Sequence, residues 1–176
     1  PALSRFAFGE TYPSRPVRWI VPFPPGGGTD ILARLIGQWL SERLGQQFVI
    51  DNRPGGGGNI GTEAAVHAPP DGYTLLLAAS VHTINPSLTD KLGFNFIQDI
   101  APVAGIMRVP NVMVLNPAVP AKSVPEFMAY AKANPGKINV ASAGIGTAQH
   151  LAAELFKLMA GIDMVHVPYR GTAPAL

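Results

Sequence analysis

The sequence predicts an α/β fold built mainly from parallel strands. Short apolar runs typical of buried strands alternate with amphipathic stretches of helical spacing along most of the chain. Three glycine-rich segments stand where a run of the first kind gives way to one of the second. Parallel strands need a crossover connection, which is usually a helix, so this alternation favours parallel pairing.

The first unit is the clearest. VRWIVPF (17–23) predicts a buried strand, ILARLIGQWLSERLG (31–45) predicts a helix, and QFVID (47–51) predicts a second strand. Thr29 or Asp30 is expected to cap the start of the helix, and Gly45 suits its left-handed end. The apolar positions at helical spacing, expected to face the core, are Leu32, Leu35 or Ile36, Trp39 and Leu44.

The same pattern continues to the end of the chain. RPGGGGNIGTEAAVHA (53–68) leads from a loop into a short helix. Ser123 and Glu126 form a capping box for a helix that stops at 134–136, and AQHLAAELFKLMAG (148–161) predicts another helix. The remaining predicted strands are YTLLLAAS (73–80), PVAGIM (102–107), VMVLN (112–116), INVAS (138–142) and DMVHVPY (163–169).

Composition excludes several classes of function. The net charge of +2 and the scattered lysines and arginines argue against nucleic acid as a partner. The chain has no cysteine, which excludes disulfides and thiolate metal sites. Its apolar runs are far shorter than the roughly 20 residues that span a bilayer, so we expect a protein that is not embedded in a membrane.

The first two glycine segments differ in what they can bind. VPFPPGGGTD (21–30) has no lysine of the kind that a nucleoside-triphosphate loop requires. Gly56, Gly58 and Gly61 form a GxGxxG pattern that opens a helix, but the acidic residue that should follow, Asp71, lies in a PPDG turn. Dinucleotide binding is therefore weakly indicated, and turn geometry or close packing also explains this second segment.

The first and third glycine segments make a better pair. In VPFPPGGGTD and in ASAGIGTAQH (141–150) a strand ends, glycines follow, and a threonine arrives at a helix start. Helix amino ends carry unpaired N–H groups and a partial positive charge, which attract anions. Thr29 with Asp30, and Thr147 with His150, bring polar groups to these ends. The alternatives are a plain helix cap for Asp30 and a locally bonded histidine for His150.

Catalytic and metal chemistry have little support in the sequence. HExxH and GxSxG are both absent, and His67, His82, His150 and His166 lack metal-ligand spacing. Ser80 lies near His82, and Ser142 near His150, but neither pair has an evident orienting carboxylate or nucleophile elbow. We therefore predict no catalytic residues, no metal site, no cofactor and no enzymatic activity.

The two ends of the chain are unusual for a compact domain. Residues 1–14 suggest either an ordered arm or the remnant of an export signal. The chain stops at VPYRGTAPAL (167–176), directly after a predicted strand. Either the chain is a fragment with an incomplete fold, or its sheet is completed by another chain, which would allow a homodimer.

Several of these motifs, in this order, resemble one known family. From YPSRPVRWIVPFPPGGGTDILARLIGQWLSERLGQQFVIDNRPGGGGNIGTEAA through PPDGYTLLLA and NPSL to ASAGIGTAQHLAAELFKLMAGIDMVHVPYRGTAPAL, the chain is similar to the Bug (TctC-type) solute-binding proteins. These are periplasmic receptors associated with tripartite tricarboxylate transporters. The resemblance runs from about Tyr12 to the last residue, although family members are longer than this chain.

The resemblance implies a periplasmic-binding-protein fold with two α/β lobes that close on a ligand. It places the first lobe at 15–108 and part of the second at 109–176. Arg170 is a further candidate as a fork for a carboxylate, or else a solvent-exposed side chain. The ligand-binding residues that the resemblance suggests are Phe23, Gly27, Gly28, Thr29, Asp30, Ser80, Ser142, Gly144, Gly146, Thr147, His150 and Tyr169, the last of which could instead be a packed strand-end aromatic.

The function implied is capture of a small carboxylate in the periplasm and its delivery to membrane transporter subunits. Di- and tricarboxylates, acidic amino acids and aromatic acids are all within the ligand range of the family. Two alternatives remain open from the sequence. One is a nucleotide-binding α/β enzyme that uses the Gly56–Gly61 segment, and the other is a truncated, non-binding remnant that folds as a partnered or swapped dimer.

Overall fold

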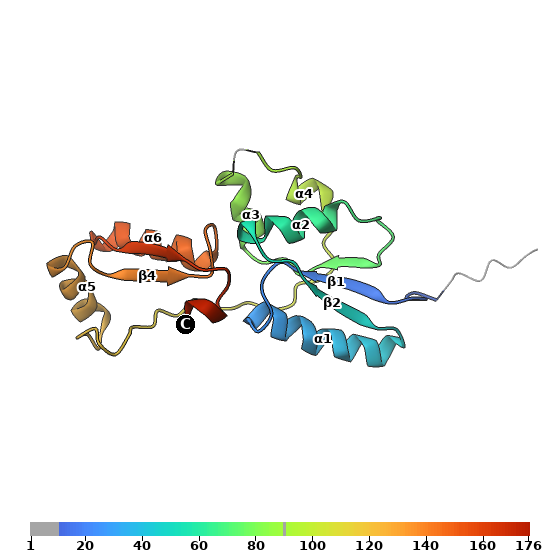
Figure 1. The fold of residues 1–176 in the computed structure, drawn as a ribbon, viewed down its shortest axis with the longest axis horizontal. Helices are drawn as coiled ribbons and strands as arrows, with labels where there is room; N and C mark the ends of the chain where they lie inside the picture. The colour runs from blue at the N-terminus through green and yellow to red at the C-terminus, as the bar shows by residue number, and fades with distance from the viewer. Residues whose placement is uncertain (1–10, 90) are drawn as a thin grey trace, which may run out of the picture.

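The computed structural model describes residues 11–89 and 91–176 and contains two separate parallel sheets. Each sheet has its own helices and its own apolar core, and an extended segment connects them (Figure 1). The α/β class with parallel sheets is therefore confirmed.

The first sheet has the strand order β2-β1-β3. The central strand β1 (Val17–Val21) pairs in parallel with β2 (Phe48–Asn52) and with β3 (Thr74–Leu76). Four of the five β1 residues are buried, as expected for a strand that is paired on both edges and covered on both faces. The strands predicted at 17–23 and 47–51 are confirmed.

Helices lie on both faces of this sheet (Figure 1). Helix α1 (Gly28–Leu44) covers one face, and α2 (Asn59–Val66) packs against β1 and β3 on the other. The short helices α3 (Val81–Ile84) and α4 (Phe96–Asp99) and the 3₁₀ turns η1 (Gly56–Gly58) and η2 (Asn85–Ser87) complete this part of the chain. Helix α1 ends as predicted, with Gly45 in the left-handed conformation at φ 71°.

The buried face of α1 differs from the one predicted. Leu35 and Trp39 are more than half exposed, whereas Ala33 and Gly37 are buried against the sheet. Helical spacing alone could not decide the face, because apolar residues surround most of this helix. Small residues allow the helix to pack closely against the sheet. A Cβ atom on Gly37 would lie 3.2–3.6 Å from atoms of Phe48 and Ile50 in β2.

The second sheet contains β4 (Asn139–Ser142) and β5 (Val165–Pro168), again in parallel. Helix α6 (Ala148–Ala160) makes the crossover, and α5 (Val124–Ala133) precedes β4. A last 3₁₀ turn, η3, covers Ala173–Ala175. The second core contains Phe127, Ala131, Ala160, Ile162 and Met164.

Two predicted strands do not form, and a third is shorter than expected. Residues 102–107 and 112–116 pair with neither sheet, although their β-branched residues favour strands. A strand requires a hydrogen-bonding neighbour, and Val103, Val112 and Val114 are instead more than 70% exposed. Strand β3 stops at Leu76, well before Ser80.

Residues 1–10, which hold most of the predicted N-terminal arm, lie outside the described residues. Within the described part, no helix is both long enough and apolar enough to cross a membrane.

Candidate functional site

The carboxyl ends of both sheets are directed toward the middle of the molecule (Figure 1). The glycine segments follow these ends and come into contact there. A Cβ atom on Gly146 would lie 2.5 Å from Oδ1 of Asn85, and one on Gly57 would lie 2.8 Å from the carbonyl oxygen of Ile145. Both glycines have positive φ, so larger residues are disfavoured there by conformation as well as by space. The second and third glycine segments are therefore neighbours.

The first glycine segment begins helix α1 without a side-chain cap. The residue at the cap position is Gly27, in an extended conformation, so the prediction that Thr29 or Asp30 caps this helix is wrong. Both residues lie inside the first turn instead. The first N–H groups of a helix have no partner within it, so the amino end of α1 offers donors and a partial positive charge. Gly27 and Thr29 are half-buried, and Gly28 is exposed.

Asp30 is a structural anchor of this segment. Its carboxylate is buried and accepts hydrogen bonds from the N–H of Gly26 at 2.9 Å, from Nδ2 of Asn52 at 2.9 Å and from Nε of Arg34 at 3.0 Å. The Arg34 guanidinium, with help from the other donors, lowers the pKa of Asp30 to about 2. The negative charge is thus neutralised within the protein, and the carboxylate is fully occupied.

Phe23 lies near the start of the same segment and is half-buried. Its carbonyl oxygen accepts a hydrogen bond of 3.0 Å from Nδ2 of Asn52, the amide that also reaches Asp30. Asn52 is the last residue of β2, and it also accepts a bond from Arg34. The sequence prediction did not include Asn52, because asparagine after a strand is also typical of an ordinary turn.

The second glycine segment has a packing role. A Cβ atom on Gly61 would lie 2.8 Å from Cβ of Pro22, so this position admits only glycine beside the end of β1. The carbonyl oxygen of Gly57 accepts a bond from Nδ2 of Asn85, which also reaches Oδ1 of Asn59 at 2.6 Å. Asn85 is buried and was not predicted as a site residue. These contacts favour close packing over a dinucleotide loop.

The third glycine segment is held by two buried hydroxyl groups. Oγ of Ser142 donates to the carbonyl oxygen of Gly144 and accepts from the Gly144 N–H, both at 3.2 Å. Oγ1 of Thr147 donates to the same carbonyl at 2.7 Å and accepts from the N–H of His150 at 3.4 Å, which caps helix α6. The predicted capping position of Thr147 is confirmed, while both side chains are occupied by the segment itself.

His150 lies one turn into α6, and its ring stacks on that of His166 from β5, with ring centroids 4.1 Å apart. Nδ1 of His150 accepts the N–H of Gly146 at 3.2 Å, and Nε2 of His166 lies 2.7 Å from Oγ of Ser142. Burial and the adjacent His150 lower the pKa of His166. Glu154 completes a cluster in which one ligand atom from each of the three residues lies within 4.8 Å of the others.

The turn after β5 contacts the first glycine segment. A Cβ atom on Gly171 would lie 3.0 Å from Cδ of Pro24. Tyr169 precedes this turn, is 39% exposed and donates its N–H to the carbonyl oxygen of Ser142. Arg170 is exposed. Both residues therefore lie near the contact between the two halves of the chain.

Ser80 does not lie at the end of a strand, contrary to the prediction. It is exposed and directly precedes α3, where its carbonyl oxygen accepts the hydroxyl of Thr83 at 2.8 Å. Four residues separate β3 from α3, because the pairing with β1 ends early.

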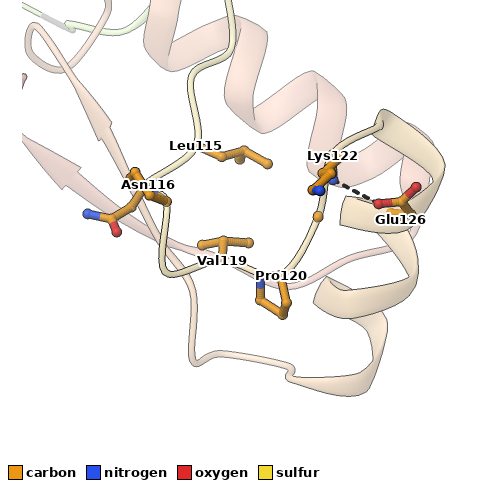
Figure 2. A pocket seen from close by; sticks show the side chains of 8 residues that line it. Leu115, Asn116, Val119, Pro120, Lys122 and Glu126 are labelled. Carbon is orange, nitrogen blue, oxygen red and sulfur yellow. Dashed lines mark hydrogen bonds between the residues drawn. The ribbon is translucent and has the colours of Figure 1, made fainter.

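A pocket of about 490 Å³ lies elsewhere, beside the start of α5 (Figure 2). None of the predicted site residues lines it. Its wall includes the Lys122 N–H, which donates to a Glu126 carboxylate oxygen at 2.8 Å. In the predicted capping box, Glu126 would instead accept the N–H of Ser123, one residue later. The lining residues are Leu115, Asn116, Pro117, Val119, Pro120, Ala121, Lys122 and Glu126.

The structure thus brings the first glycine segment, the third glycine segment and the turn after β5 to one region between the sheets. The amino end of α1, which has no side-chain cap, contributes backbone N–H groups to this region. Among the polar side chains predicted to bind a ligand, those of Asp30, Ser142, Thr147 and His150 form hydrogen bonds within these segments.

Relatives of known structure share this fold. The protein Rpa4515 of R. palustris, solved with adipate, is 41% identical with a TM-score of 0.90 over 93% of this chain and 55% of its own. MatC from Rhodopseudomonas palustris, solved with bound malate, is 34% identical with a TM-score of 0.85 over 93% of this chain and 56% of its own. A chain described as a periplasmic transporter is 46% identical with a TM-score of 0.88, over 93% of this chain and 55% of its own.

Sequence comparisons agree. Protein BugT of Bordetella pertussis is 41% identical over 169 residues, which are 95% of this chain and 52% of BugT. The chain spans about half the length of the curated relatives it matches. The model of the tripartite tricarboxylate transporter family receptor, TctC, matches residues 32–176. With most of its length matched, the chain belongs to the tripartite tricarboxylate transporter receptor family.

Proposed function

We propose that the protein is a periplasmic solute-binding receptor, not an enzyme, which captures a small carboxylate for a tripartite tricarboxylate-type transporter. The observation that carries this proposal is the uncapped amino end of α1, which opens between the two sheets. Similar chains solved with adipate and malate support a dicarboxylate as the ligand.

In the proposed mechanism, residues 15–108 and 109–176 are two lobes that close on the anion. The N–H groups of Gly27, Gly28 and Thr29 meet one carboxylate group, and the partial positive charge of α1 strengthens these bonds. The third glycine segment and Tyr169 form the facing wall. Asp30, Ser142 and Thr147 position these segments and do not contact the ligand directly.

The sharpest test exploits Gly28, the first residue of α1. Proline is well tolerated at this helix position and removes only the N–H group, and the extended Gly27 before it suits a proline that follows. Gly28→Ala is the matched control, because a Cβ atom at this position meets nothing within 4 Å. Adipate and malate binding should be measured by calorimetry, with adipamide as an uncharged comparison.

We expect Gly28→Pro to weaken dicarboxylate binding about tenfold or more, as loss of a hydrogen bond to a charged group requires, while Gly28→Ala binds normally. Adipamide should not bind. Binding of NAD without any response to acids would favour the nucleotide-binding alternative. A dimeric mass with no response to any acid would favour the non-binding remnant.

A further inference from the structure

The cluster of His150, Glu154 and His166 has the composition of a transition-metal site. Glu154 follows His150 by one helical turn, so both side chains project from the same face of α6. His166 comes from β5 and meets them from the sheet, with its ring stacked on that of His150. All three residues are half-buried. Two imidazoles and one carboxylate are a donor set that suits Zn²⁺ and related ions.

We propose that this cluster binds a divalent transition-metal ion, with Zn²⁺ as the representative ion. Ligand atoms around tetrahedral zinc lie about 3.3 Å apart, given metal–ligand bonds of about 2.0 Å. The three atoms already lie within 4.8 Å of one another, so side-chain rotation is sufficient to bring them to an ion. Water would complete the coordination.

The surroundings of His166 favour this role. Its Nε2 lies 2.7 Å from Oγ of Ser142, a buried hydroxyl that is held in turn by Gly144. Histidines that bind metals usually have a polar partner on the second ring nitrogen, which fixes the orientation of the ring. With Nε2 so engaged, we assign Nδ1 as the nitrogen that binds the metal.

Two existing interactions must change when the ion binds. Nζ of Lys157 lies 3.0–3.1 Å from the Glu154 carboxylate oxygens, and the ion replaces at least one of these contacts. Nδ1 of His150 accepts the N–H of Gly146, so the neutral ring carries its hydrogen on Nε2. Ligation through either nitrogen of His150 ends this hydrogen bond. The ion therefore releases the Gly146 N–H in the third glycine segment.

The test is calorimetric titration of the untagged, chelator-treated protein with Zn²⁺, together with the absorption spectrum after Co²⁺ is added. We expect one saturable site in the wild type and a Co²⁺ spectrum with visible d–d bands. His150→Gln, Glu154→Gln and His166→Gln should each weaken binding at least about tenfold, since even changes to outer-shell partners have effects of 10–100-fold.

His67→Gln is the matched control, because His67 is exposed and its Nδ1 lies 2.9 Å from the Glu63 carbonyl oxygen of its own helix. It should bind Zn²⁺ as the wild type does. Lys157→Met should tighten binding, because it removes the competing cation from Glu154. Circular dichroism of the metal-free variants checks that each is folded. Equal Zn²⁺ affinity in the wild type, His150→Gln and His166→Gln, or no saturable binding at all, would overturn the proposal.

Discussion

Asp30 and Arg34 form a two-point ion pair one turn apart on α1, with Nη2 of Arg34 2.9 Å from Oδ1 and Nε 3.0 Å from Oδ2. Asp30 is buried while Arg34 is about half exposed. The pair lies in the first turns of the helix, where it neutralises the charge of the buried carboxylate.

Asp30→Asn should lower the free energy of unfolding by about 2 kcal/mol, since the amide cannot accept from Gly26, Arg34 and Asn52 at once. The matched control is Glu42→Gln, which changes an exposed carboxylate of the same helix and should stay within about 0.5 kcal/mol of the wild type. Urea unfolding at pH 7 measures both. An equal effect of the two substitutions would contradict the anchoring role of Asp30.

Stability should also depend on pH through the same carboxylate. The Asp30 pKa of about 2 lies below its ordinary value of 3.8, so the folded protein binds this proton less tightly than the unfolded chain does. The resulting stabilisation, about 2 kcal/mol, is complete above pH 4 and is lost as the pH falls from about 4 toward 2. Urea unfolding from pH 2 to 6 should show a shallower slope for Asp30→Asn, whereas parallel curves would contradict the assignment.

Gly146→Ala should destabilise the third glycine segment by about 1–3 kcal/mol, because its φ is 79° and the new methyl group would collide with Asn85. Gly105→Ala is the matched control, since φ is not in the left-handed range and nothing lies within 4 Å. Thermal unfolding compares the two variants. Similar melting temperatures would show that the close approach of Gly146 and Asn85 is not maintained in solution.

Thr147→Val keeps the shape of the side chain but removes the cap of α6, and it should cost about 1–2 kcal/mol. Thr147→Ser retains the hydroxyl that bonds Gly144 and His150, so it should lose less than half as much. Chemical unfolding distinguishes the two. If valine loses no stability, packing of the side chain, and not the cap, holds this residue.

The sequence predicted the helices and strands that pack against elements nearby in the chain. The β1–α1–β2 unit and the β4–α6–β5 unit each contain a strand, a crossover helix and the next parallel strand, so local pattern was sufficient. Residues 102–107 and 112–116 have the composition of strands but no neighbour to bond. Strand formation depends on long-range pairing, which composition does not reveal.

For the candidate site, the sequence predicted the glycine-rich backbone segments but few of the side-chain contacts between them. Glycines between strands and helices correctly indicated segments that approach other parts of the chain. The neighbour of the third segment is the second, however, and the first segment contacts the turn after β5. Asn52 and Asn85 were missed because, in the sequence, an asparagine that holds a loop cannot be distinguished from one in an ordinary turn. His166 was missed as a partner of His150 because the two are 16 positions apart and meet only when β5 packs beside α6. A His-x₃-Glu spacing on α6 was the one local signal for this cluster.

Asn52 bonds both ends of the first glycine segment, at the Phe23 carbonyl and at the Asp30 carboxylate. The segment is therefore preorganised: the conformational entropy of the residues between Phe23 and Asp30 is lost when the protein folds and not when a ligand binds. In the proposed mechanism, an anion at the amino end of α1 meets donors that are already aligned. If the proposed function is correct, we expect recognition at this end to be closer to lock-and-key than to induced fit.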